Sequence, residues 1–330
     1  MGIEYSDAQV VGDALGIMNR DVLNVVVTCT KQKRFPVAKN LCLGAVGEGT
    51  VGSRFANWKS RLIGSDEEKC RVADLYAGDH WSTVLGFESS RFKVKVWVAS
   101  AGYGLIDLSD RVVPYAATFS KSNADSVFNK VPKHEYADAS RVWWQELNKW
   151  RITNHCRSLA GLARSRSSEP LLVVASENYL RAIERDLVEA VDCLDSRNQL
   201  SILSTGCKAL GGLSDCLLPG DARLQHLVGG ALRSLNTRVA SRLLRDASVE
   251  PGFRAFKRQL DILMKDLPDL PKFDREPVTD DVVAQFILGE LSVDSSLAHT
   301  PLLRRFRDRG HACEQSRFRS LYNKVKMEIS

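Results

Sequence analysis

Long hydrophobic runs are absent from this sequence of 330 residues. No stretch approaches the roughly 18 uncharged apolar residues that a membrane-spanning helix needs. Residues 1–7 also lack the basic and apolar regions that a secretion signal combines. We therefore expect a cytoplasmic protein that has no membrane partner.

Closely paired cysteines are absent as well. The eight cysteines are spread along the chain, and no two of them are separated by two residues, as zinc ribbons and dithiol redox sites require. We therefore expect no metal and no cofactor. Most of these thiols should be small buried apolar groups. Cys29 is the expected exception, because it lies in a polar and basic loop.

Charge of either sign is not in large excess, since the net charge of +6 is small for this length. The excess is concentrated near the C-terminus. Between residues 301 and 326, eight basic side chains stand against Asp308 and Glu314. The eight are Arg304, Arg305, Arg307, Arg309, Arg317, Arg319, Lys324 and Lys326. A basic segment of this kind favours contact with nucleic acid.

The length exceeds the roughly 250 residues at which one hydrophobic core stops growing, so we expect two domains. Apolar runs predict strands at 21–28, 92–100, 170–176 and 200–204, and helical periodicity predicts helices at 54–63 and 177–194. This alternation is typical of a largely parallel sheet flanked by helices, which places its ligands at the carboxyl ends of strands. We assign residues 1–220 to this α/β domain.

After residue 220 the strand pattern ends, and leucine-rich helical segments follow at 224–244, 253–267 and 282–291. The three prolines of segment 267–277 predict a linker. Further on, Thr300 as N-cap and Pro301 make a favourable helix start, Gly310 ends that helix, and a second helix is expected at 312–326. We assign residues 221–330 to an all-helical domain.

The basic end of this helical domain resembles a helix-turn-helix, an arrangement that also occurs in hairpins that bind no DNA. We expect it to contact the DNA backbone, and contact with a partner protein is the alternative. The side chains expected on DNA are Arg304, Arg305, Arg317, Arg319 and Lys324.

The first strand ends in a loop that concentrates polar and basic groups. Thr28, Cys29 and Thr30 supply two hydroxyls and a thiol, and Lys31 and Lys33 follow. Backbone amides and cations at a strand end can hold an anion such as phosphate, although no glycine-rich phosphate motif is present. Cys29 is a candidate nucleophile. The alternatives are a solvated basic loop and a structural cysteine.

The second strand ends in small residues around one aromatic side chain. Ser100, Gly102 and Gly104 let the backbone approach a flat ligand, and Tyr103 offers a face for stacking. These properties suit a nucleobase, and the alternative is a tight turn whose tyrosine packs on the sheet. Other predicted element ends add Asp74 as a candidate general acid or base, and Tyr76 and Tyr115 as further aromatic groups.

Four motifs occur in order along the chain: Thr28 to Lys31, Asp74 to Tyr76, Ser100 to Ile106, and Val113 to Tyr115. Together they resemble a family of bacterial and phage α/β domains that pairs a (S/T)C(S/T)K strand end with LY, SA(K/R)(Y/H)GL and PY motifs. That family is similar to the core domain of archaeosine synthase and to the YaaA proteins, which have a uracil-DNA-glycosylase-like fold. The resemblance covers about residues 20 to 125.

This resemblance implies action on a 7-deazaguanine base, with the two strand-end loops forming the pocket. In overall layout the chain most resembles the DpdC family, which belongs to bacterial clusters that put 7-deazaguanines into DNA and is associated with converting the 7-cyano base to its amide. The implied activity is nitrile hydration on DNA, with other proteins of the cluster as partners. The alternatives are a non-catalytic module that recognises modified DNA in a defence system, and a DNA glycosylase or nuclease.

The residue roles follow from the same resemblance. Cys29 and Asp74 would be catalytic, and Lys31 and Lys33 would hold the phosphate. A base flipped out of a duplex, or presented on a single strand, would be held by Thr28, Thr30, Tyr76, Ser100, Gly102, Tyr103, Gly104 and Tyr115.

Overall fold

The computed structural model describes residues 21–150, 158–247, 251–271 and 274–329. The chain divides into two compact units, Met1–Pro268 and Asp269–Ser330. The division falls inside the proline-rich segment that predicted a linker, and not at residue 220, because helices after 220 pack on the sheet of the first unit. Residues 1–7, on which the expectation about a secretion signal rests, lie outside the described residues.

The larger unit is built on a five-stranded sheet in the order β4-β3-β1-β6-β7. Its strands are β1 (Val22–Thr28), β3 (Lys93–Ser100), β4 (Gly104–Asp107), β6 (Leu171–Val174) and β7 (Leu200–Leu203). Neighbouring strands pair in parallel except β3 and β4. The mostly parallel sheet is therefore confirmed. β4 was not expected, and it makes the sheet mixed because the chain turns directly back from β3 to form an antiparallel edge.

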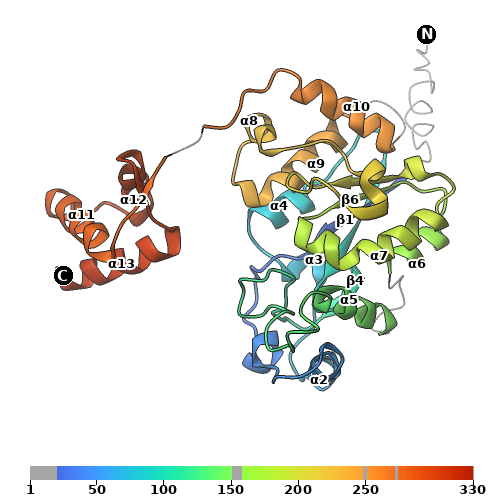
Figure 1. The fold of residues 1–330 in the computed structure, drawn as a ribbon, viewed down its shortest axis with the longest axis horizontal. Helices are drawn as coiled ribbons and strands as arrows, with labels where there is room; N and C mark the ends of the chain where they lie inside the picture. The colour runs from blue at the N-terminus through green and yellow to red at the C-terminus, as the bar shows by residue number, and fades with distance from the viewer. Residues whose placement is uncertain (1–20, 151–157, 248–250, 272–273, 330) are drawn as a thin grey trace, which may run out of the picture. The chain divides into compact units, whose positions relative to one another are not determined.

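Helices cover both faces of this sheet (Figure 1). On one side of β1 and β6 lie α5 (Ala139–Lys149), α6 (Leu159–Ser165) and α7 (Glu177–Cys193). On the other side lie α4 (Asp79–Leu85), α9 (Leu235–Arg245) and α10 (Phe253–Met264). This double cover explains why β6 is a continuous apolar run, and β1 a nearly continuous one, and why neither alternates.

The core of the larger unit continues from the sheet into a group of buried aromatic side chains. The helix expected at 54–63 is α2 (Val51–Ile63), and it buries Phe55, Trp58 and Leu62. Trp58 and, in α5, Trp143 and Trp144 are each at most 1% exposed to solvent. Shorter elements are β2 (Cys70–Arg71), α3 (Val72–Leu75), β5 (Arg111–Val112), α8 (Gln225–Val228) and the 3-10 helix η6 (Leu232–Ser234).

Helix α4 is held by a contact with the distant segment that begins α9. Gly78 is the N-cap of α4, and Asp79 is the first residue of the helix. The Asp79 carboxylate accepts hydrogen bonds from the Ser234 hydroxyl and from the Arg238 guanidinium. This contact ties residue 79 to residues more than 150 positions away.

The smaller unit contains α11 (Asp280–Val293), α12 (His299–Asp308) and α13 (Gln315–Glu328) around its own apolar core. It is not wholly helical, because β8 (Glu276–Pro277) pairs in parallel with β9 (His311–Ala312). Since β9 follows Gly310, α13 begins three residues later than the helix expected at 312. Ala298 is the N-cap of α12, so Thr300 lies inside the helix and not at its cap.

Within the described ranges, no helix has the length and apolar character to cross a membrane.

Candidate functional site

A cleft of about 610 Å³ opens at the carboxyl ends of β1 and β6. β1 and β6 are adjacent in the sheet, with β3 beside β1 and β7 beside β6. The chain that leaves β1 leads toward β3, and the chain that leaves β6 leads in the opposite direction, toward β7. The two loops therefore diverge, and the space between them is the switch point at which α/β sheets commonly bind ligands. Its lining comes from residues 28–32, 77–80, 174–176, 179, 233–234 and 236.

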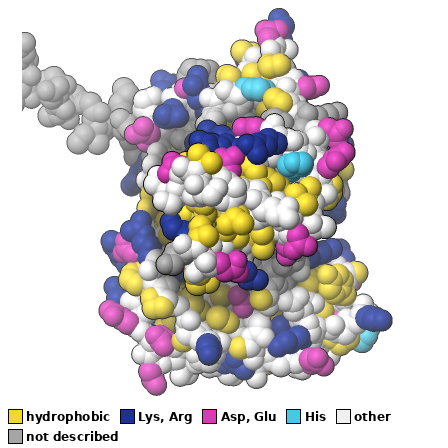
Figure 2. All heavy atoms as spheres, turned by 90° about the vertical axis from the view of Figure 1, so that its left-hand side faces the viewer, with side chains coloured by type: hydrophobic (Ala, Val, Ile, Leu, Met, Phe, Trp, Pro, Cys, Tyr) yellow, Lys and Arg dark blue, Asp and Glu magenta, His cyan; other side chains and the backbone are white. Residues whose placement is uncertain are grey.

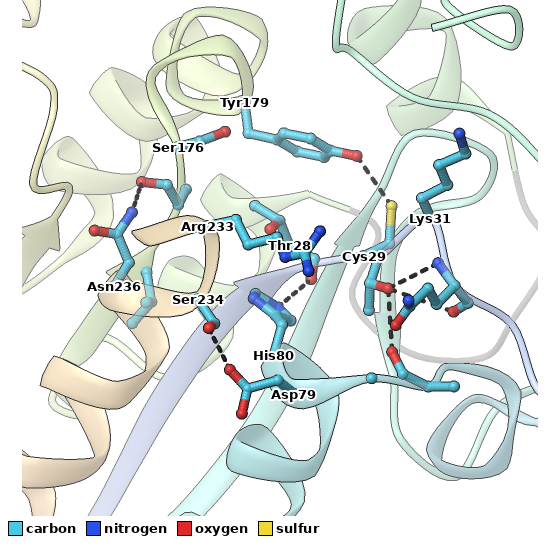
Figure 3. A pocket seen from close by; sticks show the side chains of 16 residues that line it. Thr28, Cys29, Lys31, Asp79, His80, Ser176, Tyr179, Arg233, Ser234 and Asn236 are labelled. Carbon is cyan, nitrogen blue, oxygen red and sulfur yellow. Dashed lines mark hydrogen bonds between the residues drawn. The ribbon is translucent and has the colours of Figure 1, made fainter. Parts of the chain in front are cut away.

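Cys29 and Tyr179 form a buried pair in this cleft (Figure 3). The Cys29 Sγ lies 3.1 Å from the Tyr179 hydroxyl, and the two side chains are 8% and 7% exposed. Burial raises the pKa of Tyr179 well above its usual range, and negative charge on Cys29 raises that pKa further. The phenol therefore stays protonated at neutral pH and is available as a donor beside the sulfur.

His80 of α4 also lines the cleft. Its Nε2 lies 3.1 Å from the carbonyl oxygen of Thr28 (Figure 3). A carbonyl only accepts, so Nε2 carries the proton and Nδ1 of the neutral ring is a bare acceptor. Burial lowers the pKa of His80, against smaller opposing effects of the Thr28 contact and of Asp79. The ring is thus a neutral base, and Nδ1 has no hydrogen-bond partner among the described residues.

The wall that contains η6 and the start of α9 is fixed from two sides. Contacts with Ser234 and Arg238 hold the pKa of Asp79 below its usual value. The Asn236 amide donates to the carbonyl oxygen of Ala175, 3.1 Å away, and its oxygen accepts from the Thr205 backbone. These bonds join the wall to α4 and to the end of β6.

Two cations line the cleft without forming an ion pair to a described carboxylate. Lys31 and Arg233 are both exposed, and neither forms an ion pair with another described residue. Figure 3 shows Arg233 extending from its wall to the space beside Thr28, and Lys31 extending from the loop that follows β1. On the face drawn in Figure 2, Lys and Arg side chains are interspersed with Asp and Glu, so the positive charge there does not form one continuous surface.

The remaining residues of the first loop shape it. The Thr30 hydroxyl accepts from the Gln32 amide at 3.0 Å and donates to the carbonyl oxygen of Ala77 at 3.3 Å. Lys33 does not line the cleft. Its Nζ donates to the carbonyl oxygen of Thr30 at 2.5 Å, and burial lowers its pKa. Thr28 is 8% exposed and lines the cleft beside Cys29.

The second loop is a closed turn. It joins β3 to the antiparallel β4, with Ser100 paired to Gly104. The Ser100 hydroxyl accepts from the amides of Gly102 and Tyr103, each 3.1 Å away. Tyr103 is 6% exposed and stacks on Trp150 with ring centroids 6.0 Å apart. The structure therefore matches the alternative of a tight turn, and does not place these four residues on the cleft.

Tyr76 and Tyr115 are also structural in this arrangement. Both are fully buried, and their hydroxyls are 2.7 Å apart. The Tyr115 hydroxyl also bonds Ser100 at 2.5 Å, and the Lys33 ammonium lies over both tyrosine rings. No ring face is free for stacking on a base. Burial raises the pKa of each tyrosine, and charge on Cys29 raises it further.

Asp74 is not brought to Cys29. Its carboxylate binds Arg71 at 2.8 Å, and the two side chains are 41% and 60% exposed. The structure therefore gives Asp74 a surface ion pair in place of the catalytic role expected from sequence. Of the described residues that line the cleft, Asp79 alone carries a carboxylate. No group of three or more His, Cys, Asp or Glu in the described ranges is arranged to hold a metal.

The five cations expected on DNA fall into two classes. Arg305 binds Glu290 at 2.8 Å, and Arg317 binds Asp280 at 2.6 Å, so both stabilise the smaller unit. The other three are exposed and make no ion pair within the part of the chain that the structure describes: Arg304, Arg319 and Lys324.

Sequence reasoning missed Tyr179, His80 and Arg233. Tyr179 had a local signal, because it lies in the first turn of a helix that follows a buried strand, where α/β proteins place ligand groups. His80 and Arg233 had none, since each is placed by packing against distant segments.

Comparison with known proteins found no matching protein-family model, no matching curated protein and no matching solved structure.

Proposed function

We propose that this chain modifies a 7-deazaguanine base in DNA by hydrating the nitrile of 7-cyano-7-deazaguanine to the amide. The observation that carries the proposal is the buried Cys29 thiol, held beside Tyr179 at the carboxyl end of the central strand. The identity of the base rests on the resemblance of the four ordered motifs to the uracil-DNA-glycosylase-like families of 7-deazaguanine pathways. Of these motifs, Thr28 to Lys31 lines the cleft and the other three lie outside its lining. A mostly parallel sheet with a cleft at its strand ends agrees with that fold.

The first step is addition of the Cys29 sulfur to the nitrile carbon. A carbon–sulfur bond forms and one π bond of the nitrile breaks. The nitrile nitrogen takes a proton from the Tyr179 hydroxyl, which recovers it from the thiol, so the product is a neutral thioimidate. Tyr179 suits this transfer because its raised pKa keeps the phenol protonated.

The second step consumes one water and regenerates the free enzyme. His80 Nδ1 accepts a proton from water as the oxygen adds to the thioimidate carbon, while the nitrogen receives a proton from Tyr179. The carbon–sulfur bond then breaks and the carbonyl forms. The hydroxyl proton restores Tyr179, and His80 returns its proton to the sulfur. The net change is nitrile plus water to amide, with nitrogen retained.

The DNA component of the proposal draws on the smaller unit. Arg304, Arg319 and Lys324 carry exposed charge that is not used internally, and such cations bind phosphates without reading sequence. A base in duplex DNA has to leave the stack to enter a cleft. We propose that the protein acts in the cytoplasm after other proteins of a modification cluster have inserted the 7-cyano base, as part of a restriction-modification or antiphage defence system.

The test is incubation of the protein with DNA that contains 7-cyano-7-deazaguanine, followed by digestion and measurement of nucleoside masses. The proposal expects the modified nucleoside to gain the mass of one water. An unchanged base that nevertheless raises affinity for the protein identifies a recognition module instead. Abasic sites identify a glycosylase, and strand breaks identify a nuclease. The Cys29→Ala variant is the inactive control, and Cys42→Ala, outside the cleft, is its matched partner.

A further inference from the structure

Arg233 brings a guanidinium into the cleft without an ion pair to a carboxylate among the described residues. It lies on η6 and lines the same cleft as Cys29, although the two residues are far apart in sequence. Figure 3 shows its side chain reaching the space beside Thr28. It has no ion pair with any residue that the structure describes. The position of this charge is set by a fixed wall, because the neighbouring Ser234 and Asn236 are bonded to Asp79 and Ala175.

The other titratable groups of the cleft do not cancel this charge. Asp79, the carboxylate among the described lining residues, is bound by Arg238 at 2.5 Å and by Ser234. His80 is held neutral by burial, and the Tyr179 phenol stays protonated. Lys31 adds a second cation from the loop after β1. Arg238 forms the ion pair with Asp79, and Arg233 interacts with this carboxylate only through a weaker Coulombic effect. Lys31 and Arg233 therefore leave the cleft with positive charge that a bound anion can balance.

The geometry points to a phosphate subsite centred on Arg233, so that the cleft takes a nucleotide unit and not a free base. A guanidinium binds a phosphate through two parallel hydrogen bonds. Lys31 supplies a point charge, and the exposed Ser176 hydroxyl, which makes no capping bond, is a further donor on the lining. The identity of the base rests on the proposed function. The anion preference does not, because it follows from the charges of the cleft alone.

The experiment measures binding by calorimetry and needs no turnover. Two pairs of probes are compared: 2′-deoxyguanosine against its 5′-monophosphate, and the 7-cyano-7-deazaguanine deoxynucleoside against its 5′-monophosphate. The full chain should bind each monophosphate roughly tenfold more tightly than its nucleoside. Arg233→Gln should remove that preference, and Lys31→Gln should reduce it. Arg258→Gln, an exposed arginine of α10 outside the cleft, should leave it unchanged.

Each result decides between outcomes. Equal binding of nucleoside and monophosphate, or no detectable binding of either monophosphate, overturns the phosphate subsite. A loss of affinity for both members of a pair in Arg233→Gln gives Arg233 a structural role and also overturns it. If the monophosphate preference depends on Arg233 but no base gains the mass of water, the subsite stands and nitrile hydration falls. If the base gains the mass of water but the monophosphate is not preferred, nitrile hydration stands and the phosphate subsite falls.

Discussion

The sulfur of Cys29 lies 3.1 Å from the hydroxyl of Tyr179, although the two residues are 150 positions apart in the chain. They meet because β1 and β6 are neighbours in register, with Val27 paired to Val174, and each residue follows the end of its own strand. The contact therefore depends on the strand order of the sheet and not on local sequence.

Replacing Cys29 by alanine removes the proposed nucleophile. We expect the conversion of 7-cyano-7-deazaguanine in DNA to fall by roughly a thousandfold or more, because the covalent route is lost, while affinity for DNA is kept. Single-turnover mass measurement and a binding titration provide the two readouts. Cys42→Ala should match the unaltered protein in both. Full turnover by Cys29→Ala would remove the thiol from the reaction.

Replacing Tyr179 by phenylalanine removes a hydroxyl and keeps the ring. The ring should remain packed edge-on against Phe119, with centroids 5.0 Å apart, so the fold should persist. We expect turnover to fall by about a hundredfold, because proton transfer to the nitrile nitrogen loses its donor. Tyr136→Phe, a change at a partly exposed ring outside the cleft, is the control. If Tyr179→Phe is as active as this control, Tyr179 serves only in packing.

His80 should impose the acid limit of the reaction. Burial lowers its pKa from 6.5, so Nδ1 remains a base below that pH, and turnover should fall only as pH drops through the lowered pKa. His80→Gln keeps an amide donor for Thr28 but supplies no base. We expect it to lower turnover by roughly a hundredfold and to remove this acid limb. An acid limb that survives in His80→Gln belongs to another group.

The same shift makes a prediction about stability. Because the pKa of His80 is lower in the folded chain than in the unfolded chain, protonation favours unfolding. Above the pKa of His80 in the unfolded chain, this protonation has no effect on stability. The free energy of unfolding declines as pH falls from about 6.5 toward the lower pKa of His80 in the folded chain. Urea titrations across this range should show a smaller decline in His80→Gln. The other titratable residues that line the cleft with His80 are Asp79, Arg233, Lys31, Cys29 and Tyr179.

Gly102→Ala tests the closed turn of the second loop. A Cβ at this position would lie 2.4 Å from the Tyr115 ring, which is fully buried and cannot move freely. We expect a loss of roughly 1–3 kcal/mol in the free energy of unfolding, as in other overpacked sites. Gly52→Ala, in α2 with open space around its Cβ, should instead stabilise by about 0.5–1 kcal/mol. Equal effects of the two substitutions would contradict the tight packing of this turn.

The C-terminal cations should separate into two functional classes. The triple variant Arg304→Gln, Arg319→Gln and Lys324→Gln should weaken duplex binding and reduce the salt dependence of log K by up to about three units, since each phosphate contact contributes about 0.9. Arg305→Gln with Arg317→Gln breaks exposed ion pairs. That double variant should cost less than about 1 kcal/mol per pair in stability and change the salt dependence less. Identical salt slopes in both variants would argue against a DNA role for the exposed set.

Local pattern was sufficient for β1 and α2. The run at 21–28 and the periodicity of Phe55, Trp58 and Leu62 predicted β1 and α2 correctly. It failed where the chain turned sharply, since the loop at 100–104 continues into an antiparallel strand that shares its apolar composition. Local pattern also placed the boundary between the domains at residue 220, whereas the compact units divide after Pro268. An amphipathic helix such as α9 does not show in its sequence which unit it covers.

The sequence by itself determined that a thiol follows a buried strand, because a continuous β-branched run that ends in polar residues has few other conformations. Only the tertiary structure decided what surrounds that thiol. Strand order brought Tyr179 to Cys29, and packing of α9 against α4 brought Arg233 to the same cleft. Burial took Tyr76 and Tyr115 out of the proposed base pocket. Contacts between distant segments depend on how both faces of the sheet are covered, and no local pattern carries that information.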